Sequence, residues 1–181
     1  MHLSVREIQP TDIDFIIRYW LESSDAHLVG MGVDLSKIPA RQTLQQNLRE
    51  QLNTPMEAKK AYALIWELNR QPIGHCNVNR IVFGKEAYMH LHLWEGQHRQ
   101  KGMGSLLMKK SLPFFFENLE LKILFCEPYA LNPAPNRALE KIGFKFEKTH
   151  TTTPGSLNFK QEVNLWKLDK TDYEKILQKP V

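Results

Sequence analysis

The spacing of apolar residues in the first half of the chain predicts a strand, two helices and a hairpin. Apolar and polar residues alternate where we predict strands, and apolar residues recur every three to four positions where we predict helices. Glycine and proline without a clear period indicate a loop between the two helices. In order, the predicted elements are a strand at residues 3–8, a helix at 15–21, a loop at 23–39, a helix at 40–53, and hairpin strands at 61–68 and 73–79 that turn at 69–72.

The second half of the chain predicts further strands and helices in alternation. In order, they are a strand at residues 88–94, a helix at 105–118, a buried strand at 121–126, a helix from 133 that stops at Gly143, strands at 146–153 and 158–168 joined by Pro154 and Gly155, and a short helix at 169–178. Together the two halves predict an α/β (α+β) fold. We expect a mixed, mostly antiparallel sheet of about seven strands with helices on both faces.

Length and composition fit a single globular domain that spans residues 1–181. The chain is 42% hydrophobic and 24% charged, which is ordinary for a soluble protein. No apolar run approaches the roughly 18–20 residues that a membrane-spanning helix needs. The first residues form a charged strand pattern rather than a secretory signal, so we expect no association with a membrane.

Charge and cysteine content narrow the expected partners and compartment. The net charge of +4 suits a polyanionic cofactor, but basic and acidic residues are interspersed, which argues against nucleic acid. Cys76 and Cys126 both lie in predicted strands, and neither has a nearby cysteine partner. We therefore predict reduced thiols in a cytoplasmic protein and no metal site.

The most informative motif is a glycine-containing turn between the strand at 88–94 and the helix at 105–118. It consists of Arg99, Gln100, Lys101, Gly102, Met103 and Gly104. A helix that opens directly from such a turn leaves backbone N–H groups unpaired, and the helix dipole adds positive potential there. These donors predict an anion site, typically for a phosphate, although the same pattern also occurs in simple tight turns.

A second motif follows about 30 residues later and begins at Glu127. It reads Asn132, Arg137, Glu140, Lys141, Gly143 and Phe144, in the spacing Asn-x-x-x-x-Arg-x-x-Glu-Lys-x-Gly-Phe. With the Arg-x-x-Gly-x-Gly turn, this segment resembles the GCN5-related N-acetyltransferases (GNAT), over about residues 60–168. The pattern is most similar to the RimJ/RimL-like, aminoglycoside 6′-acetyltransferase and siderophore-biosynthesis subgroups.

The resemblance implies binding of acetyl-CoA as co-substrate and direct transfer of its acetyl group to an amine. The glycine turn would bind the pyrophosphate, and the strand before it would pair with the pantetheine arm. The cofactor-binding residues implied in this way are Leu91, Leu93, Arg99, Gln100, Lys101, Gly102, Met103, Gly104, Ser105 and Asn132. A backbone N–H near Leu93 would stabilise the oxyanion.

Period-two spacing predicts a polar wall beside the glycine turn. Met89, Leu91 and Leu93 share one strand face, and Tyr88, His90, His92 and Trp94 share the other. The preceding strand carries His75, Asn77 and Asn79 on one face. If the two strands pair, these polar faces line either a wet cleft or an internal hydrogen-bond network.

Amide formation needs an unprotonated amine, and an alkylamine is about 99.9% protonated at neutral pH. His90 is the first candidate for the catalytic base, because the resemblance places it where siderophore acyltransferases carry a histidine. His92 is the second candidate. Glu127 is the main rival, at the position of the catalytic glutamate of ribosomal-protein acetyltransferases. Leu139 replaces the tyrosine that many members use as the acid, which leaves the acid open, with Tyr129 as one candidate.

The acceptor amine stays open among a protein N-terminus, an amino sugar and a hydroxylated lysine of siderophore pathways. We expect acceptor contacts from Asp25, His27, Asp34, His75 and Asn77. An alternative function is an acyl-CoA-binding sensor without turnover. The sequence is compatible with a monomer or a homodimer.

Overall fold

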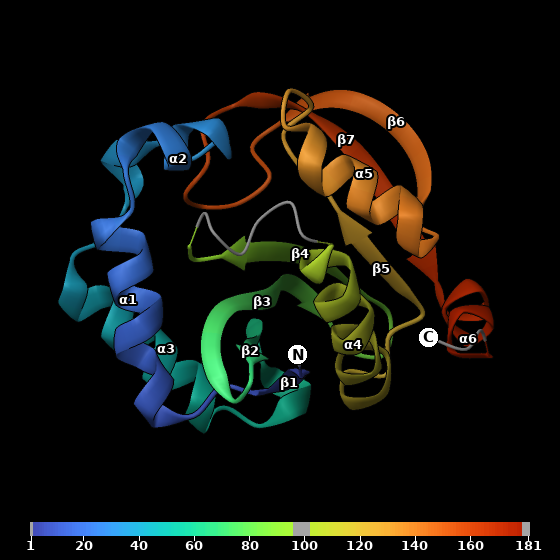
Figure 1. Ribbon diagram of the computed structural model, residues 1–181, viewed down its shortest axis with the longest axis horizontal. Coiled ribbons are helices and arrows are strands. Elements are labelled where there is room, and N and C mark those ends of the chain that lie inside the picture. The colour runs from blue at the N-terminus through green and yellow to red at the C-terminus, as the bar shows by residue number, and fades with distance from the viewer. Residues whose placement is uncertain (1, 96–101, 179–181) are drawn as a thin grey trace.

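A computed structural model describes residues 2–95 and 102–178, and its strands form one seven-stranded sheet (Figure 1). The strand order is β1-β2-β3-β4-β5-β7-β6, and β4 and β5 are the parallel pair among antiparallel neighbours. The strands are β1 (Leu3–Glu7), β2 (Ala61–Leu68), β3 (Gln71–Val82), β4 (Glu86–Leu93), β5 (Ile123–Cys126), β6 (Lys145–Thr152) and β7 (Gln161–Asp169). The predicted mixed, mostly antiparallel sheet is confirmed.

Helices cover both faces of this sheet, as predicted (Figure 1). The α-helices are α1 (Ile13–Glu22), α2 (Asp25–Gly30), α3 (Arg41–Asn53), α4 (Met103–Asn118), α5 (Pro133–Ile142) and α6 (Lys170–Gln178), and the 3-10 turns are η1 (Pro10–Asp12), η2 (Leu35–Lys37) and η3 (Met56–Ala58). Across the described ranges, none of these helices combines the length and apolar character needed to cross a membrane.

The predicted loop at residues 23–39 is wrong, because α2 and η2 lie within it. Ser24 caps α2, and its side-chain oxygen accepts a hydrogen bond from the His27 backbone N–H. The helix is too short for a helical period to show in the sequence. Its end is set by Gly32, whose φ of 83° is left-handed, so the glycines that suggested a loop instead terminate a helix.

The hairpin between β2 and β3 is tighter than the predicted turn at 69–72. Only Asn69 and Arg70 lie between the strands, with φ values of 50° and 67°. Positive φ at both central residues is typical of the two-residue turns that match strand twist. Pro72 already belongs to β3, next to a register shift in β2, where a missing N–H is tolerated.

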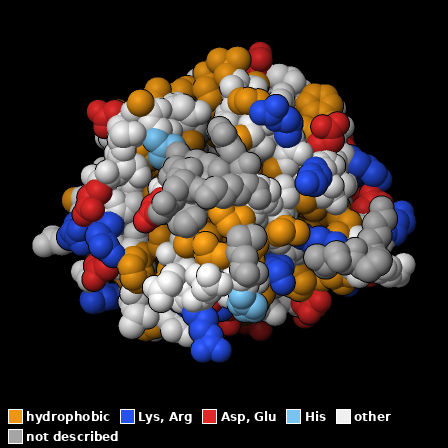
Figure 2. All heavy atoms as spheres, in the orientation of Figure 1, with side chains coloured by type: hydrophobic (Ala, Val, Ile, Leu, Met, Phe, Trp, Pro, Cys, Tyr) orange, Lys and Arg blue, Asp and Glu red, His pale blue; other side chains and the backbone are white. Residues whose placement is uncertain are grey.

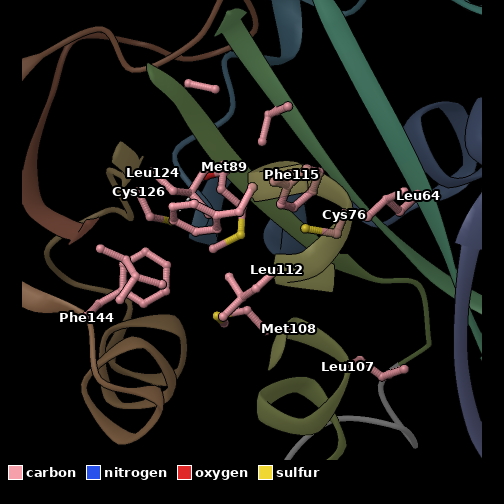
Figure 3. Close-up of a cluster of buried hydrophobic side chains, with 14 of the residues drawn as sticks. Leu64, Cys76, Met89, Leu107, Met108, Leu112, Phe115, Leu124, Cys126 and Phe144 are labelled. Atoms are coloured by element: carbon pink, nitrogen blue, oxygen red, sulfur yellow. Dashed lines mark hydrogen bonds between the residues drawn. The ribbon is translucent and has the colours of Figure 1, made fainter. Parts of the chain in front are cut away.

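Alternation along β2 divides the core between the two faces of the sheet. Tyr62, Leu64 and Trp66 pack with the cluster that includes α4, whereas Ala63 and Ile65 pack with α1 and its neighbours. Figure 3 shows the larger cluster, in which α4 side chains meet residues of β2, β3, β4 and β5. Since both faces of β2 are buried, its register is fixed by burial on each side.

The parallel pair β4 and β5 separates near the middle of the sheet. Their pairing ends at Met89 and Cys126, although β4 continues to Leu93. Beyond Cys126 the chain leaves the sheet and reaches α5 at Pro133. The sheet therefore opens between the end of β4 and the start of α5.

A buried hydrogen bond ties α4 to the sheet and provides a test of this packing. Trp66 Nε1 donates to Ser111 Oγ at 2.8 Å, and that hydroxyl donates to the Leu107 carbonyl at 2.9 Å. We expect Ser111→Ala to lower the free energy of unfolding by about 1 to 3 kcal/mol, because the indole N–H stays buried without an acceptor. Urea unfolding measures this change.

The matched control is the double variant with Trp66→Phe. Removing both partners of a buried hydrogen bond costs less than the sum of the single removals. Strictly additive losses in Ser111→Ala, Trp66→Phe and the double variant would contradict the expected coupling.

Candidate active site

Two adjoining cavities meet at the opening between β4 and β5. The first, of about 670 Å³, lies at the beginning of α4 and along α5, and we call it the helix-end cavity. The second, of about 340 Å³, lies over the polar residues of β3 and β4, and we call it the polar cavity. Met31, Leu91, Asn132 and Pro135 line both. A molecule in one cavity can therefore reach a molecule in the other.

The helix-end cavity is built around the first turn of α4. Gly102 is the N-cap with φ of 72°, and no side chain of the described residues caps this helix end. Gly102, Gly104 and Ser105 line the cavity, whereas the side chain of Met103 is buried in the core. Among the described residues, a Cβ on Gly104 would meet only Leu93 Cδ1, at 3.7 Å, so those residues leave the backbone open to a ligand. Arg99, Gln100 and Lys101 lie outside the described residues.

Positive charge flanks this helix end. Arg137 and Lys141 of α5 line the helix-end cavity, and Figure 2 shows Lys and Arg side chains gathered over α5. The first backbone N–H groups of α4, which have no carbonyl partner within the helix, and two cations on α5 form a site of positive potential. This donor set fits a polyanionic ligand such as a diphosphate.

The backbone of Leu91 faces the opening in the sheet. Trp94 N–H donates to the Ile73 carbonyl in β3 at 3.0 Å, so the backbone groups of alternate residues before it also point toward β3. The backbone groups of Leu91 belong to the alternate set that points away from β3, toward the side of β5. Because β5 no longer pairs with β4 beyond Met89, that side of Leu91 is open. An extended ligand can form strand-like hydrogen bonds there.

The pairing of β3 with β4 joins the two polar faces predicted from the sequence. His75 pairs with His92, Asn77 with His90, and Asn79 with Tyr88. The prediction of one continuous polar wall is confirmed. His75, Asn77, Asn79, His90 and His92 all line the polar cavity.

His75 and His92 form an internal aromatic network at one end of this wall. Their rings stack with centroids 4.4 Å apart. Trp94 Nε1 donates to His75 Nδ1 at 2.8 Å, and the Tyr19 hydroxyl lies 3.3 Å from His92 Nδ1. Burial lowers the pKa of His75 to about 3 and holds the pKa of His92 well below its usual value. Both rings are therefore neutral at pH 7.

His90 is the histidine of the wall whose ring nitrogen has an unmet hydrogen-bond capacity. Its Nε2 is buried, and no partner for it lies among the described residues. Burial, and secondly the positive charge of Arg80, lower the pKa of His90 to about 4. The imidazole is therefore neutral at pH 7, and its unprotonated ring nitrogen can accept a proton from a molecule in the polar cavity.

Glu127 is already engaged by two side chains. Arg80 Nη2 lies 2.6 Å from Glu127 Oε2, and His150 Nε2 lies 3.2 Å from Oε1. The carboxylate is 5% exposed. The Arg80 guanidinium also lies over the Tyr88 ring, 3.4 Å from its centroid. Proton transfer to Glu127 has to compete with both contacts.

Arg80 was not among the site residues expected from the sequence. Its backbone is left-handed, with φ of 48°, at a register shift between Asn79 and Val82. This irregularity interrupts the alternation of β3. The sequence feature that could have indicated Arg80 is its position directly after the polar residues His75, Asn77 and Asn79 of β3.

Some of the remaining predicted residues line a cavity and others do not. His27 lines the helix-end cavity, 3.2 Å from the Tyr19 hydroxyl, and Tyr129 lines the polar cavity. Asp25 is exposed in the first turn of α2, and Asp34 caps η2. Neither of these two residues lines either cavity. Leu139 is buried in the core. Over residues 2–95 and 102–178, no group of three or more His, Cys, Asp and Glu side chains is arranged to hold a metal ion.

Comparison with known proteins gives one family match. A family profile described as an acetyltransferase (GNAT) domain matches residues 2–145. No curated protein sequence matches the chain. The matched segment contains the opening between β4 and β5, the three catalytic candidates His90, His92 and Glu127, and the start of β6.

Solved structures with the same fold cover nearly the whole chain. Spermidine N-acetyltransferase from Vibrio cholerae, in complex with CoA and spermine, is 16% identical with a TM-score of 0.77, over 95% of this chain and 98% of that one. The ribosomal L7/L12 α-N-protein acetyltransferase RimL, in complex with coenzyme A, is 14% identical with a TM-score of 0.75, over 94% and 95%. An uncharacterised protein from Bacillus halodurans is 16% identical with a TM-score of 0.71, over 96% and 87%. At these identities the likeness establishes the fold alone.

The buried, neutral histidines make stability depend on pH. Because the folded-state pKa values of His75 and His92 lie below the unfolded value near 6.5, their contribution is complete above pH 6.5 and is lost as pH falls below it. We expect each to remove up to about 1.4 kcal/mol of unfolding free energy per pH unit below pH 6. Urea unfolding at pH 7.5, 6.0 and 5.0 measures the slope.

The variant His75→Asn reduces this slope, because one proton-binding group of the unfolded chain is gone. His2→Asn is the matched control, since His2 is exposed in the folded protein. An equal slope in wild type and His75→Asn would contradict the assignment.

Proposed function

The chain belongs to the GNAT acetyltransferase family, and on this premise we propose that it is an acetyl-CoA-dependent N-acetyltransferase that acts on a primary amine. The observation that carries the proposal is the junction of the two cavities at Leu91 and Asn132. One cavity offers an anion site at the beginning of α4, and the other offers the His90 imidazole. Acetyl-CoA supplies the activated acetyl group, and direct transfer requires both reactants to be bound together.

The helix-end cavity would hold the cofactor. Backbone N–H groups of the α4 first turn, near Gly102 and Gly104, would bind the pyrophosphate, and Arg137 and Lys141 would add positive charge. The backbone of Leu91 would hydrogen-bond the pantetheine arm, and Asn132 would contact it beside the opening. Arg99, Gln100 and Lys101 remain predicted contacts to the same diphosphate.

His90 would accept the proton that the amine loses as the new bond forms. The nitrogen becomes strongly acidic as it attacks the carbonyl, so an imidazole with a pKa of about 4 is basic enough at that moment. Burial and the Arg80 charge also favour the neutral, nucleophilic amine over its ammonium form. Glu127, engaged by Arg80 and His150, serves in this proposal to hold that side of the cavity.

Two further groups would complete the transfer. A backbone N–H of β4 at the opening would donate to the carbonyl oxygen as negative charge develops on it. Tyr129, a residue that lines the polar cavity, is the candidate proton donor to the departing thiolate. His92 would support His90 indirectly, because it belongs to the network of Tyr19 and His75.

A sensor that binds acyl-CoA without turnover is the second candidate. It is favoured by Leu139, which is buried in the core at the position where many family members place a tyrosine acid. His90 Nε2, which has no hydrogen-bond partner among the described residues, favours catalysis instead.

The variant His90→Ala separates these two functions. We expect kcat/KM for thiol release with an amine to fall by about 100-fold or more, because the proton acceptor is lost. Binding of CoA, measured by calorimetry, stays unchanged because His90 does not line the helix-end cavity. CoA binding without thiol release from any amine, in wild type and variant alike, would favour the sensor.

The variant Gly104→Glu tests the helix-end cavity. A carboxylate at the beginning of α4 repels the diphosphate, and we expect the Kd for CoA to rise by about 100-fold, equivalent to about 2.7 kcal/mol. Lys110→Glu is the matched control, since Lys110 is an exposed residue of the same helix and lines neither cavity. Equal weakening by both variants would contradict a diphosphate site at Gly104.

A further inference from the structure

The polar cavity offers no spare negative charge. Of its described lining residues, Glu127 is the one with a formally charged side chain at pH 7, and Arg80 lies 2.6 Å from its carboxylate. The three histidines of the wall are neutral because their pKa values are lowered by burial. A ligand with several positive charges would find no free carboxylate among the described lining residues.

The same cavity presents buried hydrogen-bond acceptors without partners. Gln51 Oε1, Asn79 Oδ1 and Gln161 Oε1 are amide oxygens with no partner among the described residues. Their side chains all line the polar cavity. An unpaired buried acceptor costs about 1 to 3 kcal/mol, so a molecule that brings N–H or O–H donors is favoured.

The orientation of Gln161 follows from its own contacts. Its Nε2 donates to the Gly32 carbonyl at 2.8 Å and to the Phe159 carbonyl at 3.1 Å. The amide nitrogen therefore points toward these carbonyls, and Oε1 is the atom left over. Gln161 is 5% exposed, so bulk water does not meet this oxygen freely.

A clasp between two loops closes one side of the polar cavity. Val33 and Asn158 form an isolated β-bridge, and the Asp34 N–H donates to the Leu157 carbonyl at 2.8 Å. The clasp brings residues 154–158 against His90, since a Cβ on Gly155 would lie 3.8 Å from His90 Cε1. At about 340 Å³, the cavity is at the small end of the roughly 300–1,000 Å³ of ligand pockets.

We propose that the acceptor is a small monoamine whose other polar groups are uncharged hydrogen-bond donors, as in an amino alcohol or amino sugar. This inference rests on the proposed function, because it takes the polar cavity as the amine site. The reacting nitrogen lies at His90, and hydroxyl groups donate to the amide oxygens of Asn79, Gln161 and Gln51. Polyamines are disfavoured because each additional ammonium is desolvated without a carboxylate partner, and Arg80 adds repulsion. The clasp disfavours an extended polypeptide.

Calorimetry on the protein saturated with CoA tests this inference without turnover. The probes are glucosamine, n-hexylamine, spermidine and a tetra-alanine peptide. We expect glucosamine to bind at least about 10-fold more tightly than each of the other three, since one satisfied buried acceptor corresponds to roughly that factor.

Two substitutions at Asn79 separate charge from hydrogen bonding. Asn79→Leu removes the carbonyl oxygen, and we expect about 10-fold weaker binding of glucosamine with little change for hexylamine. Asn79→Asp adds a carboxylate of the same shape, and we expect spermidine to bind about 10-fold more tightly. Asn47→Asp adds the same charge at an exposed position of α3 that lines neither cavity, and it leaves all four affinities unchanged.

Tighter binding of spermidine or the peptide than of glucosamine to the wild type would overturn the inference, and so would binding of none of the probes. Glucosamine affinity unchanged in Asn79→Leu would also overturn it. Thiol release from acetyl-CoA distinguishes this result from failure of the proposed function. Glucosamine binding without thiol release contradicts the proposed catalysis and leaves the inference on the ligand intact. Thiol release with spermidine alone supports catalysis and contradicts the inference on the ligand.

Discussion

The separation of β4 from β5 beyond Met89 and Cys126 is the constraint on which the rest of the site depends. A parallel pair that stays together leaves no backbone group for a ligand, whereas here Leu91 faces an opening. The same separation lets the helix-end cavity and the polar cavity meet. The chain has to leave the sheet after Cys126 to reach α5, so the connection that builds the second motif also creates the opening.

A polar wall inside a sheet is stable only if its groups are paired or neutral. At one end His75 and His92 stack and are held neutral by burial, with Trp94 and Tyr19 as hydrogen-bond partners. At the other end the carboxylate of Glu127 forms an ion pair with the Arg80 guanidinium, at 2.6 Å. Between these two ends lies the His90 imidazole, with a nitrogen for which the described residues provide no partner. Among the described residues of the wall, unmet hydrogen-bond capacity therefore lies at His90 Nε2 and Asn79 Oδ1, both on the lining of the polar cavity.

Much of the candidate site could be predicted from period-two spacing and two short motifs. The wall of His75, Asn77, His90 and His92 follows from alternation, because paired strands must place such residues side by side. Arg80 could not be found in this way, since a left-handed residue at a register shift breaks the alternation that reveals facing. The helix at 25–30 was missed because its six residues make fewer than two turns, which is too short for a helical period to show.

The sequence by itself determined the order of the strands and of the longer helices, the glycine turn before α4 and the facing of the wall. Each depends on residues close together along the chain, where spacing and backbone preference act directly. Only the tertiary structure decided that Arg80 pairs with Glu127 and that loops around residues 33 and 158 close over His90. Those contacts join segments 47 and 125 positions apart, and their energies depend on burial and distance, which no local pattern records.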